Sequence, residues 1–131
     1  MVSSVQVRPA GKTDMPAIRG LIRQFPKQLV QQNLPRVTSF FVAYSGGNLV
    51  GCCALQIYSK RMAEVRSLAV HPDFQDRGVA SKLVKCCTQR AIERGIREVF
   101  AVTSQISFFE KLGFATFRRE KTAMFLEHRP G

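Results

Sequence analysis

No part of this chain of 131 residues forms a long apolar run. None approaches the roughly 20 consecutive apolar residues that a helix needs to cross a bilayer. The start Met1-Val2-Ser3-Ser4 is too polar for a secretory signal, and repeats, linkers and low-complexity segments are lacking. We therefore expect a cytoplasmic protein that forms one domain over residues 1–131 and makes no contact with a membrane.

Acidic residues are scarce. The chain has 9 Asp and Glu against 20 Lys and Arg, which gives a formal net charge of +11. The electrostatic field of a protein with so large a positive charge attracts polyanions. The basic residues recur singly or in pairs, however, and no aromatic residues alternate with them as in RNA-binding signatures. A solvated basic surface that favours an anionic small molecule is therefore a better interpretation than a nucleic-acid groove.

The spacing of the cysteines differs from the usual zinc and redox motifs. The 4 cysteines form two adjacent doublets, Cys52-Cys53 and Cys86-Cys87, and neither has CxxC spacing. Neighbouring cysteines rarely bridge each other. We predict no metal site and expect one cysteine of each doublet to face the core while the other faces away.

Hydrophobic residues are plentiful, at 45% of the chain with 10 Phe, so a packed core is expected. Their periodicity and the turn signals predict an α+β domain. The expected elements are a strand at 5–8, a helix from an N-cap at Thr13 to Pro26, strands at 39–44 and 49–58 joined by Gly46-Gly47-Asn48, a strand at 62–70, an amphipathic helix that ends at Gly95, a strand at 99–102, a short helix at 106–112, and strands at 114–117 and 122–125.

Residues 27–37 fit either a short helix or a loop. The helix before Gly95 has an apolar face, with basic residues largely outside it. That face comprises Leu83, Val84, Cys87, Ala91 and Ile92.

The segment between the strand at 62–70 and the next helix is the most informative. The first N–H groups of a helix have no internal partner and carry partial positive charge, so they bind phosphate. Gly78 would let the backbone approach an anion, and Ala80 would keep the first turn clear, while Arg77 and Lys82 add positive charge. On these grounds alone, an anion site and an ordinary strand-to-helix turn both remain open. The sequence has neither the Walker nor the dinucleotide glycine pattern.

Three stretches together resemble the GNAT superfamily of N-acetyltransferases. Leu68-Ala69-Val70-His71-Pro72 followed by Gln75-Asp76-Arg77-Gly78-Val79-Ala80 is similar to the superfamily signature, and Phe108 to Phe114 is similar to its short helix before the last strands. The order of elements fits as well. The resemblance implies a single mixed, mostly antiparallel sheet of six to seven strands, flanked by helices, with a splayed central strand pair.

A closer similarity is to the acetyltransferase domain of bacterial N-acetylglutamate synthases and its small stand-alone relatives. Ala63 to Val70, Thr103-Ser104-Gln105 and Phe108 to Phe114 carry it. The amino-acid-kinase domain of the long synthases is missing from this chain. The resemblance implies transfer of an acetyl group from acetyl-CoA to a primary amine, such as the α-amino group of glutamate. A protein acetyltransferase and a non-catalytic CoA-binding module are the alternatives, and a dimer is compatible with the sequence.

The resemblance also implies positions for the acetyl-CoA. It would lie between the strands Glu64 to Val70 and Glu98 to Val102, with backbone groups of Leu68 and Val70 along the pantetheine arm. The Val70 amide would stabilise the oxyanion. The pyrophosphate would be bound by Gln75, Asp76, Arg77, Gly78, Val79 and Ala80.

Glu64 is our candidate for the base that deprotonates the amine. The alternative is a surface carboxylate paired with Lys60 or Arg66. Strict alternation puts Glu64 and Ser67 on opposite faces, so both reach the cleft only if the strand has a bulge.

An α-carboxylate substrate needs a guanidinium, and we favour Arg66 for it. Arg19, Lys60 and Arg118 are the other candidates. The tyrosine that many relatives use as the acid is replaced by Phe108 and Phe109, so the acid is open. Ser67, Thr103 and Ser104 are candidates to donate the proton or to position a water, and the alternative is that each is an ordinary strand-end hydroxyl.

Overall fold

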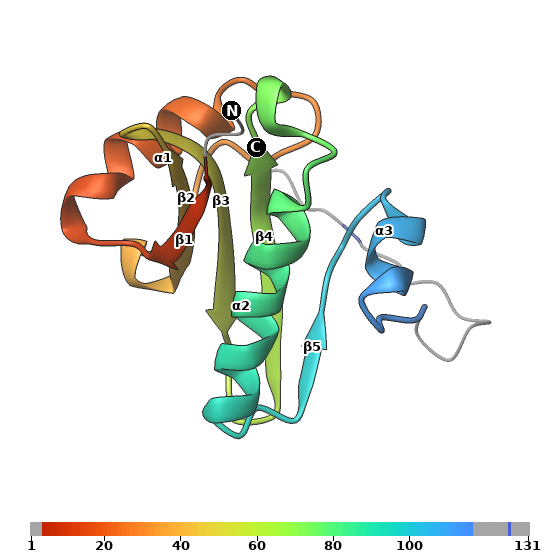
Figure 1. Ribbon diagram of the computed structural model, residues 1–131. Helices are drawn as coiled ribbons and strands as arrows, with labels where there is room; N and C mark the ends of the chain where they lie inside the picture. Colours follow the sequence, from red (N-terminus) through yellow and green to blue (C-terminus); the bar gives the residue numbers. More distant parts are fainter. Residues whose placement is uncertain (1–3, 117–125, 127–131) are drawn as a thin grey trace.

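The computed structural model describes residues 4–116 and Leu126 (Figure 1). Five strands form one sheet in the order β1-β2-β3-β4-β5. Neighbours from β1 to β4 are antiparallel, and β5 is parallel to β4. The strands are β1 (Gln6–Pro9), β2 (Phe40–Ser45), β3 (Asn48–Ile57), β4 (Met62–Val70) and β5 (Glu98–Phe100), and the helices are α1 (Met15–Ile22), α2 (Val79–Glu93) and α3 (Ile106–Lys111).

The predicted α+β class and the mixed, mostly antiparallel sheet are confirmed. The sheet has five strands within the described residues, whereas six to seven were expected. The strand expected at 122–125 lies outside the described residues. The strand expected at 114–117 is not present over its described part, residues 114–116, and residue 117 lies outside the described residues. In the part of the chain that the structure describes, no helix is long and apolar enough to span a membrane.

Two helices cover the two faces of the sheet. Ile18, Leu21 and Ile22 of α1 pack on one face, and Leu83, Val84 and Cys87 of α2 pack on the other. Alternate residues of β2 and β3 point to these two cores, as strand geometry requires. In Figure 1, α2 crosses in front of β3 and β4. Ile92, expected on the buried face of α2, is 70% exposed, and its neighbour Ala91 is the residue of that turn that packs in the core.

The burial of the sheet on both faces also corrects the prediction for one cysteine doublet. Cys52 contacts the α1 core and Cys53 contacts the α2 core, so both are buried. The prediction holds for the second doublet, where Cys87 is buried and Cys86 only partly so. Burial raises the pKa of Cys52 to about 12, so its thiol stays protonated at neutral pH.

The first helix begins differently from the prediction. A 3-10 turn covers Lys12–Asp14, and α1 follows at Met15, so Thr13 is not its N-cap. The reason is that Asp14 turns inward: its carboxylate accepts hydrogen bonds from Gly11 N at 2.7 Å and from Tyr44 Oη at 2.6 Å. Arg8 adds Nη1 at 2.9 Å and Nη2 at 3.2 Å. Residues 27–37, left open above, form a loop up to the 3-10 turn Val37–Ser39.

Candidate functional site

The loop between β4 and α2 brings together all six residues predicted to hold the pyrophosphate. A 3-10 turn, Pro72–Phe74, follows β4, and α2 begins at Val79. Gly78 is its N-cap with φ of 80°, in the left-handed region that favours glycine. Lys82 N donates to Gly78 O at 3.1 Å as the first bond of the helix. The N–H groups of Val79, Ala80 and Ser81 therefore lack a partner within α2 and are free to bind an anion.

Side chains within this loop hold its shape. Gln75 Nε2 donates to Val70 O at 3.0 Å, and the Arg77 guanidinium lies 5.2 Å from the centre of the Phe74 ring. The side chain of Val79 is buried in the core. The side chains of Gln75 and Val79 thus support the loop, which leaves backbone N–H groups and the charge of Arg77 for a ligand.

Gly51 of β3 is a residue that the sequence analysis missed. A Cβ atom there would lie 3.0 Å from Leu83 Cδ1 and 3.2 Å from Val79 Cγ1. The start of α2 can therefore approach the sheet only because residue 51 has no side chain. This close approach fixes the position of the helix N-terminus relative to β4.

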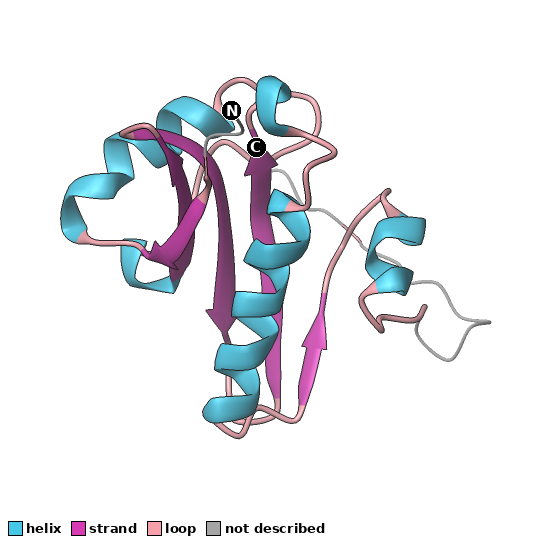
Figure 2. Ribbon diagram, in the orientation of Figure 1, coloured by secondary structure: helices cyan, strands magenta, loops and turns pink. Residues whose placement is uncertain are grey.

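A cleft opens where β4 and β5 part. The two strands pair only from Met62 with Glu98 to Glu64 with Phe100, although β4 continues to Val70. Figure 2 shows β5 and the loop after it diverging from β4. The splayed strand pair is therefore present. The cleft has a volume of about 470 Å³ and is lined by Gln28, Leu29, Val30, Glu64, Val65, Arg66, Ser67, Leu68, Ala101, Val102, Thr103, Ser104, Gln105 and Phe109.

A bulge in β4 brings Glu64 and Ser67 to the same cleft. The register with β3 shifts between Cys52 and Ala54, and Ser67 has a positive φ of 56°. The extra residue changes the alternation of side chains, as a bulge does. Glu64 and Ser67 both line the cleft, as the predicted bulge requires.

Beyond the bulge, the backbone of β4 presents donors on its open side. His71 N donates to Val50 O of β3 at 2.8 Å. Because successive residues of a strand direct their backbone groups to opposite edges, the N–H groups of Leu68 and Val70 are directed away from β3. The carbonyl of Val70 already accepts a hydrogen bond from the Gln75 side chain. The N–H of Val70 is therefore the backbone group of this residue that can bind a ligand.

Glu64 lies at the inner end of the cleft beside Arg66. Its side chain is 16% exposed, and its Oε1 lies 4.0 Å from Arg66 Nε. Of the two partners considered for a surface carboxylate, only Arg66 is in ion-pair range. Arg66 Nη1 also donates to Gln56 Oε1 at 3.4 Å, and most of its other N–H groups have no partner within the described chain.

A tyrosine that the sequence analysis did not identify as a site residue binds the same carboxylate oxygen of Glu64 that lies near Arg66. Tyr58 Oη donates to Glu64 Oε1 at 2.6 Å, and its ring stacks on Phe100 with centroids 6.2 Å apart. Burial, followed by this hydrogen bond, raises the pKa of the Tyr58 phenol. No sequence motif indicated this contact, which depends on how β3, β4 and β5 are paired.

The position of the missing tyrosine is filled by packed phenyl rings. Phe109 is buried and contacts Phe108 and Phe114 edge to face, with ring centroids about 5 Å apart. The three residues with hydroxyl groups that line the cleft are Ser67, Thr103 and Ser104. Thr103 Oγ1 accepts from Gln105 N at 2.8 Å, so one of its functions is to hold the start of α3.

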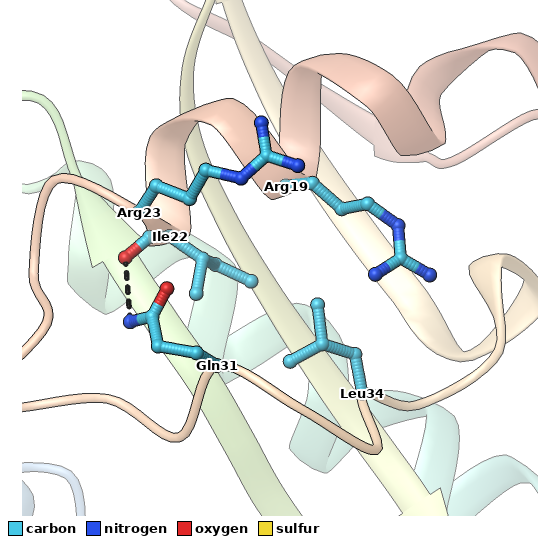
Figure 3. A pocket seen from close by; sticks show the side chains of 5 residues that line it. All are labelled: Arg19, Ile22, Arg23, Gln31 and Leu34. Carbon is cyan, nitrogen blue, oxygen red and sulfur yellow. Dashed lines mark hydrogen bonds between the residues drawn. The ribbon is translucent and has the colours of Figure 1, made fainter.

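A separate, smaller cavity of about 230 Å³ lies at the end of α1. Figure 3 shows Arg19 and Arg23 extending from one side of it, with Gln31 and Leu34 on the other. Gln31 Nε2 donates to Ile22 O at 3.1 Å and so helps to close the helix. Arg19 is thus placed outside the main cleft, and Arg118 lies outside the described residues, so Arg66 is the one guanidinium that lines the cleft in the described chain.

Comparisons with known proteins agree with this geometry. A model of the Acetyltransferase (GNAT) family matches residues 13–114, which include the loop and the cleft. An uncharacterized N-acetyltransferase of Chlorobaculum tepidum is 35% identical over 94 residues, covering 72% of this chain and 61% of the relative. An amino-acid acetyltransferase of Mycobacterium tuberculosis is 33% identical over 116 residues, covering 82% and 67%. One of Pasteurella multocida is 30% identical over 122 residues, covering 87% of this chain but 28% of that relative.

Solved structures show the same fold. Rv2747 from Mycobacterium tuberculosis, in complex with CoA and NLQ, has a TM-score of 0.79 and 32% identity, covering 84% of this chain and 71% of that one. N-acetylglutamate synthase from Neisseria gonorrhoeae, complexed with coenzyme A and N-acetyl-glutamate, has a TM-score of 0.71 and 27% identity, covering 86% and 28%. Both relatives therefore bind CoA on a fold like this one.

Proposed function

Since the chain belongs to the acetyltransferase (GNAT) family, we propose that it transfers an acetyl group from acetyl-CoA to the α-amino group of an amino acid. One observation carries the proposal: Glu64 and Arg66 lie 4.0 Å apart in the cleft that opens along β4. A carboxylate base and a guanidinium this close together suit a substrate whose amino group and carboxylate are attached to the same carbon, as in an α-amino acid. The amino-acid acetyltransferases among the relatives support this acceptor class. Glutamate is the leading candidate because N-acetylglutamate synthase is among the similar structures.

The residues present fit the cofactor. The N–H groups of Val79, Ala80 and Ser81 at the start of α2 suit a pyrophosphate, and Gly78 leaves space beside them. Arg77 and the net charge of +11 favour the same polyanion. Acetyl-CoA supplies an activated acetyl thioester when bound along β4.

The chain's own groups would act on the acceptor. Arg66 orients the α-carboxylate through paired N–H donors. The carboxylate of Glu64 takes a proton from the neighbouring ammonium, because only the neutral amine is a nucleophile. The Val70 N–H, directed away from β3 on the open edge of β4, stabilises the negative charge that develops on the carbonyl oxygen. Ser67, Thr103 or Ser104 supplies a hydroxyl near the departing thiolate, directly or through water.

Release of free thiol from acetyl-CoA across a panel of amino acids, polyamines and peptides tests this function. We expect release with α-amino acids, and we expect Arg66→Lys to raise the KM for the amino acid at least about tenfold, because the paired donors are lost. The KM for acetyl-CoA should not change. Arg23→Lys is the matched control, since Arg23 lines the separate cavity.

Other outcomes of the same assay select the alternatives. Release with peptides but not with free amino acids would indicate a protein acetyltransferase. Tight acetyl-CoA binding without thiol release with any amine would indicate a non-catalytic CoA-binding module, and our proposal would be wrong.

A further inference from the structure

Tyr58 and Phe100 enclose Glu64 at the point where β4 and β5 part. Glu64 is paired with Gln56 on β3 and with Phe100 on β5, and the pair with Phe100 is the last one before the strands separate. Tyr58, just after β3, places its ring on Phe100 with an interplanar angle of 20°. Its hydroxyl then meets Glu64 Oε1 at 2.6 Å.

We infer that Tyr58 is the positioning residue of Glu64, which holds one carboxylate oxygen so that the other is directed to the acceptor amine. This inference rests on the proposed role of Glu64 as the base. Tyr58 is 55% exposed and is not among the residues that line the cleft, so it acts through Glu64 and not on the substrate. A hydrogen bond to a charged acceptor of this length is a strong one.

The position of Tyr58 is itself well determined. Its backbone N–H donates to Met62 O at 3.0 Å, which closes the turn between β3 and β4. The stack on Phe100 restricts rotation of the Tyr58 ring, and the hydrogen bond from the Tyr58 hydroxyl restricts rotation of the Glu64 carboxylate. Few other contacts restrain the Glu64 side chain, because its charged neighbour is Arg66, whose Nε lies 4.0 Å from Glu64 Oε1. Loss of the hydroxyl alone should therefore leave the fold intact and the carboxylate free to rotate.

The chain offers a matched control. It has 2 tyrosines, and Tyr44 also donates to a carboxylate at 2.6 Å, that of Asp14. Asp14 is remote from the cleft residues in sequence and is not among them. Tyr44→Phe and Tyr58→Phe thus each remove one tyrosine–carboxylate hydrogen bond. Only Tyr58→Phe should affect turnover.

The kinetic test compares Tyr58→Phe, Glu64→Gln and the double variant in amino-acid-dependent thiol release. We expect Tyr58→Phe to lower kcat about tenfold or more, with both KM values and the melting temperature unchanged. In the Glu64→Gln background, Tyr58→Phe should have no further effect. Tyr44→Phe should lower the melting temperature and leave kcat unchanged.

The possible failures are distinguishable. If Glu64→Gln abolishes turnover but Tyr58→Phe retains the wild-type kcat, the positioning role is wrong and the proposed base stands. An equal loss from Tyr58→Phe in both backgrounds means that Tyr58 acts independently of Glu64, which also overturns the inference. Full activity of Glu64→Gln removes the base and the positioning role together.

A second readout does not depend on turnover. The chain has no Trp and 2 Tyr, so the ultraviolet absorbance of tyrosinate can follow both phenols. Because the bond to Glu64 contributes to the raised pKa of Tyr58, Glu64→Gln should lower the pH at which one of the two phenols ionises. Unchanged titration of both phenols would contradict the contact on which the inference depends.

Discussion

Two tyrosine–carboxylate pairs of equal length have different surroundings in this molecule. Asp14 accepts from Tyr44 at 2.6 Å, from both terminal nitrogens of Arg8 and from Gly11 N, and it is 4% exposed. Glu64 accepts from Tyr58 at 2.6 Å and has Arg66 at 4.0 Å. The first carboxylate is saturated with donors, whereas the second keeps one oxygen available beside a cleft. Both carboxylates accept a hydrogen bond from a tyrosine, so this bond does not distinguish them. We infer that a reactive carboxylate differs from a structural one in having an oxygen that accepts no hydrogen bond from the protein.

The largest effect is expected when the available carboxylate is removed. Glu64→Gln should lower amino-acid-dependent turnover by a factor on the order of 10² to 10⁴, the usual contribution of a general base. Its melting temperature should stay close to that of the wild type, because few bonds hold Glu64. A stopped assay of thiol release at saturating acceptor measures this. A wild-type rate in this variant would remove Glu64 from the mechanism.

Substitution of Asp14, whose carboxylate has all its donors within the protein, should lower stability and leave turnover unchanged. Asp14→Asn loses the ion pair with Arg8 and leaves buried donors without a full acceptor, which costs about 1–3 kcal/mol of the free energy of unfolding. Urea denaturation followed by circular dichroism measures the loss. Below the unfolding transition, kcat should equal that of the wild type. A folded Asp14→Asn variant with impaired chemistry would erase the distinction between the two pairs.

Gly51 tests how closely α2 must approach the sheet. Gly51→Ala places a methyl group 3.0 Å from Leu83 Cδ1, so we expect about 1–3 kcal/mol of destabilisation and weaker CoA binding as the helix start moves. Gly20→Ala is the control, since nothing lies within 4 Å of a Cβ there. It lies inside α1, where Ala is favoured over Gly by about 0.5–1 kcal/mol. Calorimetric titration with CoA and urea denaturation give the two readouts. Equal CoA affinity in both variants would contradict this role of Gly51.

The smallest effect expected is a change in the pH dependence of stability. The hydrogen bond from Arg8 holds the pKa of Asp14 well below its usual range. Because the pKa of the folded state is the lower one, the stabilisation is fully present above about pH 4, the value for an unfolded Asp, and is lost as the pH falls below it. Asp14→Asn should therefore lose less stability than the wild type below pH 4. Identical acid-unfolding curves for the two proteins would contradict this.

The sequence predicted the site best where local rules apply. The bounds of β4 match the expected 62–70, because a proline follows soon after it. The glycine and the helix that follows made the loop from Gln75 to Ala80 compatible with an anion site, and the resemblance to the GNAT superfamily selected that interpretation over an ordinary turn. The bulge at Ser67 was expected as the condition for Glu64 and Ser67 to share a cleft, and it is present.

Features that depend on pairing across the sheet were not predictable in this way. The contact between Tyr58 and Glu64 needs the register of β3 with β4 and the stack on β5. Burial of Cys52 depends on a helix covering the second face, and the close approach at Gly51 depends on how α2 is placed. Thr13 looked like an N-cap because nothing local indicates that Asp14 turns inward.

The most direct test of the proposed function is a mass spectrum of the products formed from acetyl-CoA and a mixture of α-amino acids. We predict an N-acetyl amino acid that is formed by the wild type and by Asp14→Asn below its unfolding transition, and that is missing with Glu64→Gln. Bound CoA with every amino acid left unmodified by the wild type would contradict the account.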